Sequence, residues 1–223
     1  MIAPKRSPAY DPDCTRCPRL AAYLEATRKR EPDYWARPVP SFGAAQPRIL
    51  IVGLAPGMHG ANRTGRPFTG DHAGILLYRT LYEQGLASAP GSASASDDLA
   101  LLDARIANAV KCAPPGNKPL PEEIRRCNAW LQQELAQLSA VRVYLALGRI
   151  AHDAVLLARG LARSRHPFRH GREHALEEAR TLIDSYHCSR YNTSTRRLTP
   201  AMFRDVVRRA CELAGLGSAE EIA

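Results

Sequence analysis

The sequence predicts an α/β protein in which helices cover both faces of a parallel β-sheet. Two observations carry this prediction. Four short apolar runs, rich in β-branched residues, are typical of buried strands. Segments with helical patterning separate these runs, and strands that alternate with helices normally form a parallel sheet buried on both faces.

The expected strands follow the apolar runs, of which Ile-Leu-Ile-Val before Gly53 is the clearest. They cover residues 48–53, 106–111, 141–147 and 181–186. The expected helices cover residues 18–30, 74–85, 121–138, 149–162 and 200–214. Pro18 suits a first helical turn, because the N–H group that proline lacks would be unpaired there in any case.

Two segments stand outside this alternation. Residues 1–47 hold eight prolines around one helical stretch, which predicts an extension that wraps around the domain. Residues 87–98 are mostly small and polar, which predicts a flexible surface loop. Because 223 residues fit one mid-sized domain, we expect a single domain over residues 1–223.

The charge is strongly positive and comes mostly from arginine. Lys and Arg number 31 against 22 Asp and Glu, a net charge of +9, and 27 of these cations are Arg. Residues 141–209 alone contribute +8. Because guanidinium groups match phosphate oxygens, the charge of residues 141–209 favours contact with a nucleic acid. The alternative is an arginine-rich composition set by a GC-rich genome.

Composition also excludes some classes of protein. The longest apolar run, in residues 49–55, is far too short to span a bilayer. The first six residues have no apolar stretch typical of a secretory signal. We therefore expect a cytoplasmic protein with no membrane partner, in which cysteines serve as ligands or stay free rather than form disulfides.

Unusual segments follow each expected strand. They cover residues 53–71, 111–119, 148–149 and 187–199. Because the carboxyl ends of parallel strands lie at one edge of a sheet, these loops should converge there, where open α/β sheets bind ligands. The sequence therefore predicts one site built from four loops.

The first of these loops contains five glycines but lacks the spacing of a P-loop or a dinucleotide-binding fingerprint. Dense glycine lets backbone approach a ligand closely. Phe68 offers a flat face for a ring, and Arg63 and Arg66 suit phosphate groups. The alternative is an irregular loop in which Phe68 is buried as part of the core.

Two other loops carry groups suited to the same ligand. His187 follows the last expected strand, where an imidazole can donate a hydrogen bond to developing negative charge. The Ser, Asn, Thr and Arg residues after it suit phosphate contacts. Asn117 has an amide that can pair with the edge of a base, although asparagine is also common in ordinary turns.

Four of the six cysteines have spacing typical of a metal or cluster site. Cys14 and Cys17 form a C-x-x-C pair, while Cys112 follows the second expected strand and Cys127 lies in the next helix. One crossover connection can bring all four together, which suits a [4Fe–4S] cluster or structural zinc. The alternative is a chance C-x-x-C pair with Cys127 in the core.

Together these segments resemble the uracil-DNA glycosylase superfamily, and most closely its iron–sulfur branch, called family 5 or type B. The resemblance covers residues 14–199 and rests on several motifs in the right order. They are the four cysteines, Gly-Leu-Ala-Pro-Gly from Gly53, Asn-Arg-Thr-Gly-Arg-Pro-Phe-Thr-Gly-Asp over residues 62–71, Lys-Cys-Ala-Pro-Pro-Gly-Asn-Lys-Pro over residues 111–119, and His187 followed by Asn192-Thr-Ser-Thr and Leu198-Thr199.

The resemblance implies a three-layer α/β/α sandwich around a four-stranded parallel sheet, with a structural [4Fe–4S] cluster on Cys14, Cys17, Cys112 and Cys127. It implies a DNA-repair enzyme, a monofunctional glycosylase that flips uracil out of DNA and hydrolyses its N-glycosidic bond. Because the first motif is apolar, we also expect hypoxanthine or other deaminated bases as substrates. We expect a monomer, associated with the nucleoid of a prokaryotic cell.

The resemblance also implies roles for individual residues. His187 stabilises the departing uracil anion, and Asp71 is the second catalytic candidate. The base-binding candidates are Ala55, Gly57, Phe68, Asn117 and Asn192. The DNA-binding candidates are Arg63, Arg66, Ser189, Arg190, Tyr191, Thr193 and Thr195, with Arg190 or Tyr191 as the wedge that fills the vacated stack.

Two positions leave the attacking water without an evident partner. Other branches place a carboxylate in the first motif, where this chain has Leu54 and Ala55. Family 5 commonly has an Asp at the start of the next helix, where this chain has Ile75. Asp71 or a backbone carbonyl then has to hold the water. Two alternatives stay open: a damage-binding protein of the same superfamily with little turnover, and a zinc-dependent nucleic-acid-binding module.

Overall fold

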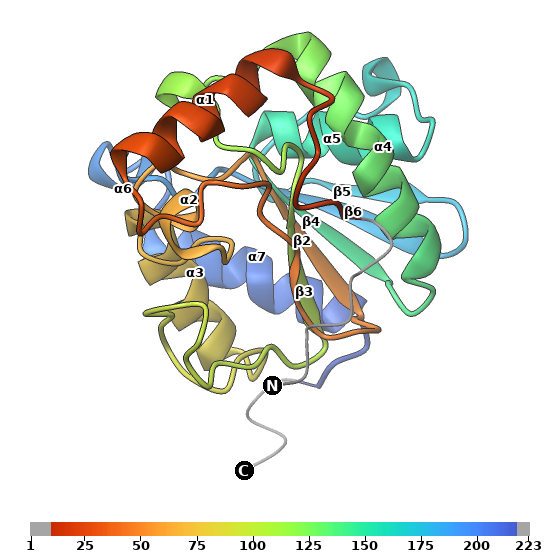
Figure 1. The fold of residues 1–223 in the computed structure, drawn as a ribbon. Helices are drawn as coiled ribbons and strands as arrows, with labels where there is room; N and C mark the ends of the chain where they lie inside the picture. Colours follow the sequence, from red (N-terminus) through yellow and green to blue (C-terminus); the bar gives the residue numbers. More distant parts are fainter. Residues whose placement is uncertain (1–9, 218–223) are drawn as a thin grey trace.

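The described elements pack around a six-stranded sheet with the strand order β1-β3-β2-β4-β6-β5 (Figure 1). The computed structural model describes residues 10–217, so the first nine residues of the expected extension and the last six of the expected domain lie outside the described residues. The strands are β1 Phe42–Gly43, β2 Ile49–Gly53, β3 Ala104–Asn108, β4 Val143–Leu147, β5 Glu173–Leu176 and β6 Arg180–Ser185.

The four inner strands β3, β2, β4 and β6 run parallel, which confirms the predicted central sheet. The sequence does not predict the two antiparallel edge strands, β1 beside β3 and β5 beside β6. β1 has only two residues, and β5 alternates exposed residues with buried or half-buried ones. Neither therefore has the continuous apolar run that marks a strand buried on both faces.

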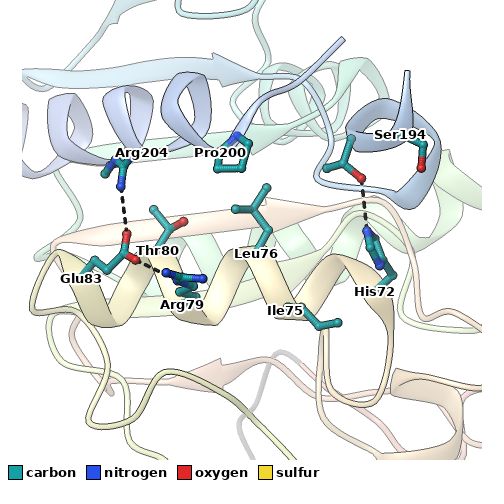
Figure 2. Close-up of a pocket in the computed structure, with 10 residues that line it drawn as sticks. His72, Ile75, Leu76, Arg79, Thr80, Glu83, Ser194, Pro200 and Arg204 are labelled. Atoms are coloured by element: carbon teal, nitrogen blue, oxygen red, sulfur yellow. Dashed lines mark hydrogen bonds and ion pairs between the residues drawn. The ribbon is translucent and has the colours of Figure 1, made fainter. Parts of the chain in front are cut away.

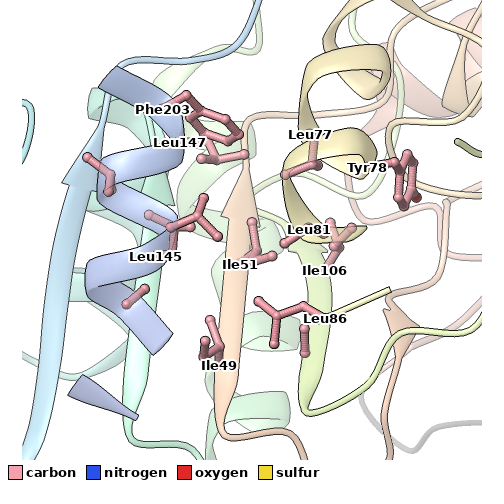
Figure 3. Close-up of a cluster of buried hydrophobic side chains, with 14 of the residues drawn as sticks. Ile49, Ile51, Leu77, Tyr78, Leu81, Leu86, Ile106, Leu145, Leu147 and Phe203 are labelled. Carbon is pink, nitrogen blue, oxygen red and sulfur yellow. The ribbon is translucent and has the colours of Figure 1, made fainter. Parts of the chain in front are cut away.

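Helices cover both faces of the sheet, as predicted. The helices are α1 Pro18–Arg30, α2 Ala61–Thr64, α3 His72–Glu83, α4 Pro121–Gln137, α5 Arg149–Ala158, α6 Arg190–Ser194 and α7 Pro200–Leu213, with short 3-10 turns η1 Pro115–Asn117 and η2 Arg163–Arg165. α3 and α7 pack against Ile51 and Leu145 on one face (Figure 3). α4 and α5 pack against Leu50 and Val52 on the other. None of the helices within residues 10–217 is long and apolar enough to cross a membrane.

The largest differences from the expected ends are at β3 and α5, which end three and four residues early. β3 ends at Asn108, and the next two residues still donate to the carbonyls of Gly53 and Leu54, at 2.9 and 3.0 Å. α5 ends at Ala158, and Gly160 follows with φ of +68°, a left-handed conformation that does not continue a helix.

Residues 87–98, the segment expected to form a flexible loop, contact the rest of the domain through an ion pair. The buried guanidinium of Arg66 pairs with Asp97, which also accepts three backbone N–H groups of its own turn. Burial tends to raise the pKa of Asp97, but Arg66 and these N–H groups lower it to about 2. The carboxylate therefore stays charged and holds the loop against the segment that leads to α3.

We expect the central core to be sensitive to loss of packing. Leu145→Ala removes a fully buried side chain from β4, so it should lower the free energy of unfolding by about 2–5 kcal/mol. The matched control is Leu157→Ala on α5, where the side chain is 46% exposed and the loss should stay within about 0.5 kcal/mol. Equilibrium denaturation measures both, and equal losses would contradict this packing.

Candidate functional site

A cavity of about 420 Å³ opens at the carboxyl end of the parallel strands. Loops after β2, β3 and β6 line it together with the start of α3, so three of the four loops expected to converge do so. The fourth expected loop, residues 148–149 after β4, does not line the cavity. Of the predicted site residues, the wall contains Ala55, Gly57, Phe68, Asp71, Asn117, His187, Ser189 and Arg190. Leu54, Ala61, His72, Ala73 and Asn108 complete it.

Phe68 forms a flat apolar wall of this cavity. Its φ is +56°, in the left-handed region, and the chain turns sharply there before α3 begins. Gly74 makes room for this turn, because a Cβ at that position would overlap the carbonyl oxygen of Phe68. The ring lies 5.8 Å from the His187 imidazole, centroid to centroid, with 27° between the planes. A planar ligand can therefore stack on Phe68 beside His187.

Asn108, which the sequence reasoning missed, ends β3 and faces the same cavity. Its Oδ1 is buried and has no hydrogen-bond partner among the described residues, so a ligand donor would satisfy it. Asn117 also lines the cavity, but it lies on η1 and is exposed. The signal that points to Asn108 is a polar amide inside the apolar run Ile-Ala-Asn-Ala-Val.

His187 is held by the loop after β6. The predicted base-binding residue Asn192 does not line the cavity; its Nδ2 instead donates to the His187 carbonyl at 2.8 Å. Burial lowers the pKa of His187, and the negative charge of Asp71 offsets this only in part. The imidazole is therefore neutral at pH 7 and can donate one N–H group without transferring a proton.

Asp71 supplies a carboxylate to the cavity. Its Oδ1 accepts the Gly74 N–H at 2.9 Å and caps α3, while its Oδ2 lies toward Gly57 and Gly60. Ile75 is 66% exposed and does not line this cavity. An apolar residue at position 75 therefore removes no acid from the cavity of this chain.

The short helix α6 places several predicted DNA contacts at the mouth of the cavity. Arg190 lines the cavity, and the next residue, Tyr191, is 71% exposed. Ser189 caps the helix with its side chain. Thr193 Oγ1 lies 3.2 Å from His72 Nε2, which ties α6 to the start of α3.

Three other predicted DNA contacts lie outside the cavity wall. Arg63 and Thr195 are exposed, and each donates to a backbone carbonyl of its own helix or the preceding turn. The prediction for Arg66 is wrong. Its buried guanidinium already bonds to Asp97, Ser92 and the Ala95 carbonyl, so it is not available to a phosphate.

A larger groove of about 580 Å³ lies beside this cavity, between α3 and α7 (Figure 2). Its charged side chains already pair with one another. Glu83 pairs with both Arg79 and Arg204, and His72 bonds to Thr193. Unpaired polar groups suited to a ligand lie instead in the smaller cavity, which we take as the candidate active site.

The four predicted ligand cysteines surround a separate small cavity of about 20 Å³. Cys14 and Cys17 come from the segment that enters α1, Cys112 from the loop after β3, and Cys127 from α4. The backbone N–H of Lys111 donates to Cys127 Sγ at 3.3 Å.

Electrostatics at these cysteines favours a bound cation or cluster. Burial, followed by the neighbouring Cys127, raises the pKa of Cys17 to about 11. Burial and the neighbouring cysteines likewise raise the pKa of Cys112. Four thiolates would repel one another in this place, so only a positively charged group would hold them ionised.

Comparison with known proteins gives consistent matches. The family model described as "Uracil DNA glycosylase superfamily" matches residues 40–211. A type-5 uracil-DNA glycosylase of Thermus thermophilus is 56% identical over 209 residues, which cover 91% of this chain and 94% of that protein. One of Mycobacterium leprae is 46% identical over 211 residues, with 91% and 92% covered. A type-4 enzyme of Thermotoga maritima is 36% identical over 141 residues, with 62% and 58% covered.

The protonation state of His187 can be measured directly. We expect its imidazole to titrate below the ordinary value of 6.5, because burial disfavours the charged ring. Asp71→Asn should lower that pKa further, since the Asp71 charge raises it. NMR of the ring resonances against pH measures both. A pKa above 6.5, or a rise in Asp71→Asn, would contradict the neutral donor.

Proposed function

The chain belongs to the uracil-DNA glycosylase superfamily, and from that premise we propose how its cavity excises uracil from DNA. It is a DNA-repair enzyme, a hydrolase of N-glycosidic bonds. The nucleotide must leave the duplex before the enzyme can reach this bond. The single observation that carries the proposed chemistry is the unpartnered Oδ1 of Asn108 beside Phe68 and His187.

Asn108 is the proposed base-reading residue. Its Oδ1 accepts from the uracil N3–H group, and its amide N–H donates to O4. Cytosine presents an acceptor and a donor in the reverse order, so the same amide rejects it. Hypoxanthine presents an N–H group beside a carbonyl, as uracil does, which supports a substrate range that includes it. Asn117 lies at the rim of the cavity, above the base.

His187 stabilises the leaving group. As the glycosidic bond breaks, uracil gains negative charge, and the sugar gains oxocarbenium character. The neutral imidazole donates its N–H group to a uracil carbonyl oxygen, and one such oriented donor is worth about 3 kcal/mol of transition-state stabilisation. Asn192 is a positioning residue for His187, since it bonds to that residue's backbone.

Asp71 is the proposed partner of the attacking water. It is the carboxylate in the cavity wall, and its Oδ2 lies toward the glycines of the first motif. A negative charge there orients water toward the sugar and favours the positive oxocarbenium ion. The damage-binding alternative rested on the apolar residue at position 75, and Ile75 lies outside the cavity.

Residues at the mouth of the cavity are the proposed contacts to the DNA backbone. Arg190 and Ser189 lie where the phosphates of the extruded nucleotide would pass, and the exposed ring of Tyr191 suits the wedge that fills the vacated stack. Thr193, Thr195 and Arg63 are further phosphate contacts around them. We propose a monomer that acts in the cytoplasm, on nucleoid DNA.

The cysteine site suits a [4Fe–4S] cluster better than zinc. Sulfur ligands on one tetrahedral zinc ion lie about 3.8 Å apart, since the Zn–S bond is about 2.3 Å. Among residues 10–217, no three of these sulfur atoms all lie within 4.8 Å of one another. The cluster would be held by Cys14, Cys17, Cys112 and Cys127. It would take no part in the hydrolysis and would link the N-terminal segment to the chain after β3 and to α4.

Base release tests the site. His187→Ala should slow single-turnover release of uracil from a duplex by about 100-fold, because the leaving anion loses its donor. Asn108→Ala should lower kcat/KM by about 10- to 100-fold, and Asn117→Ala by only a few-fold. Equal losses at Asn108 and Asn117 would contradict the assignment of the reader. No release by the wild type with an intact cluster would contradict the activity.

Metal content tests the cysteine site. The purified protein should be brown, with four iron and four sulfide per chain, and Cys112→Ala should lose iron and melt at lower temperature. Cys211→Ala, a buried cysteine of α7, is the matched control and should keep its iron. A colourless wild type that contains zinc would reject the cluster.

A further inference from the structure

The segment between α5 and β5 is a strongly basic loop with no assigned role. Residues 163–172, here called the basic loop, contain four arginines, two histidines and no acidic residue. Arg163, Arg165, Arg169 and Arg172 are all exposed. Among residues 10–217, only Arg163 of these four pairs with an acid, Asp153 at 3.3 Å. The remaining three guanidinium groups are available to an anionic partner.

The basic loop lies at the same edge of the sheet as the candidate active site. β5 runs antiparallel to β6 with Glu173 opposite Ile183, so the residues before β5 lie at the carboxyl end of β6. Gly171 N–H donates to the Asp184 carbonyl at 2.7 Å. The backbone N–H of Tyr186, directly before His187, donates to His170 Nδ1 at 3.1 Å.

A network of buried side chains is hydrogen-bonded to the backbone of the basic loop. The Asp184 carboxylate is fully buried and accepts from His152 Nδ1 at 2.7 Å and from His174 Nε2 at 3.1 Å. Its Oδ2 also accepts the Arg169 backbone N–H at 3.2 Å. His152 Nε2 lies 2.8 Å from the carbonyl of His166 in the loop. Both the backbone and the side chain of Asp184 therefore hold the loop.

The network carries a positive charge on His152. Both of its ring nitrogens face oxygen acceptors, Asp184 and the His166 carbonyl, so both must carry a proton. Burial opposes this charge, but the hydrogen bond and the charge of Asp184 raise the pKa of His152. The result is an imidazolium–carboxylate pair inside the protein, which is costly to break because either partner alone would be a buried charge.

A shared metal ion does not fit these three side chains. Nitrogen and oxygen ligands of tetrahedral zinc, at about 2.0–2.1 Å from the ion, lie about 3.3 Å apart. The distances from Asp184 to His152 and His174 are 2.7 and 3.1 Å, which are hydrogen-bond lengths. Protons, rather than an ion, therefore bridge the group, and its role is to hold the loop.

The basic loop contacts the segment that carries the arginines after β6. The His170 ring stacks on Tyr186 at 4.9 Å, and the Arg197 guanidinium lies over the same Tyr186 ring at 4.6 Å. Arg197 follows α6, which carries Arg190. Tyr186 therefore lies between the basic loop and Arg197, and Arg190 of the same segment lines the cavity.

We propose that the basic loop is a second DNA-contacting surface, which binds backbone phosphates of the duplex beside the extruded nucleotide, and that the network of His152, Asp184 and His174 positions it. The proposal rests on the proposed function in that the DNA is the substrate duplex. Arginine forks bind phosphate oxygens without reading sequence, so this surface adds affinity and leaves base choice to the cavity.

The test compares two double variants that remove the same charge. Arg169→Gln/Arg172→Gln changes the basic loop. Arg142→Gln/Arg208→Gln is the control, with two exposed arginines before β4 and on α7. Affinity is measured for an undamaged duplex across a salt series, since phosphate contacts do not depend on uracil. Single-turnover uracil release at saturating protein is measured separately.

We expect the basic-loop variant to bind about tenfold more weakly, and its slope of log affinity against log salt to fall by about 1.8 for two phosphate contacts. Uracil release at saturation should match the wild type. Equal affinities and slopes in the two double variants would overturn the proposal. Because the affinities are measured on undamaged DNA, failure of the wild type to release uracil would count against the proposed function alone.

The positioning role has its own readout. Asp184→Asn removes the charge that holds the imidazolium, so hydrogen exchange of the residue 163–172 amides should speed up and the salt slope should fall toward that of the basic-loop variant. His174→Gln keeps the carboxylate and one donor and should change both less. If Asp184→Asn folds with unchanged exchange and an unchanged slope, the network does not position the loop. If Asp184→Asn fails to fold, His174→Gln is the test. Hydrogen exchange and a salt slope both equal to those of the wild type would then overturn the positioning role.

Discussion

The missing side chain at Gly53 allows two groups of the cavity wall, Asn108 and Phe68, to meet at one point of the sheet. Gly53 ends β2 and pairs with Asn108 at the end of β3. A Cβ at Gly53 would lie 2.5 Å from Asn108 Oδ1 and 2.7 Å from the Phe68 ring. Any side chain there would separate the Asn108 amide from the Phe68 ring. The backbone conformation at Phe68 and the space left by Gly74 serve the same arrangement.

The cysteine site and the base-reading site share one segment of chain. Cys112 follows Asn108 by four residues, and the two residues after Asn108 donate to the carbonyls of Gly53 and Leu54 at the end of β2. Lys111 lies next to Cys112, donates its backbone N–H to Cys127, and pairs its side chain with the buried Glu134. A cluster bound at the four cysteines would therefore fix the chain after β3, and with it the position of the Asn108 amide. A cluster can in this way support the reaction without taking part in it.

Much of the architecture could be predicted from sequence because parallel strands leave long β-branched runs, and because the ends of such strands must share one edge. Phe68, Asp71 and His187 follow the ends of such strands in the sequence, and they line one cavity. Asn108 could not be singled out from the sequence, because one amide within an apolar run looks like part of a strand. Arg66 could not be separated from the phosphate-binding candidates, because its pairing with Asp97, 31 residues away, leaves no local pattern. The edge strands β1 and β5 could not be predicted, because neither has the continuous apolar run that marks a buried strand.

A crystal structure with a duplex that contains 2′-fluoro-2′-deoxyuridine would test the central claim most directly, since the fluorine slows bond cleavage by disfavouring the oxocarbenium ion. Our account predicts that the extruded uracil stacks on Phe68, with the Asn108 amide within hydrogen-bond distance of N3 and O4 and His187 beside a carbonyl oxygen. A uracil that pairs with Asn117 instead, or that lies outside this cavity, would contradict it.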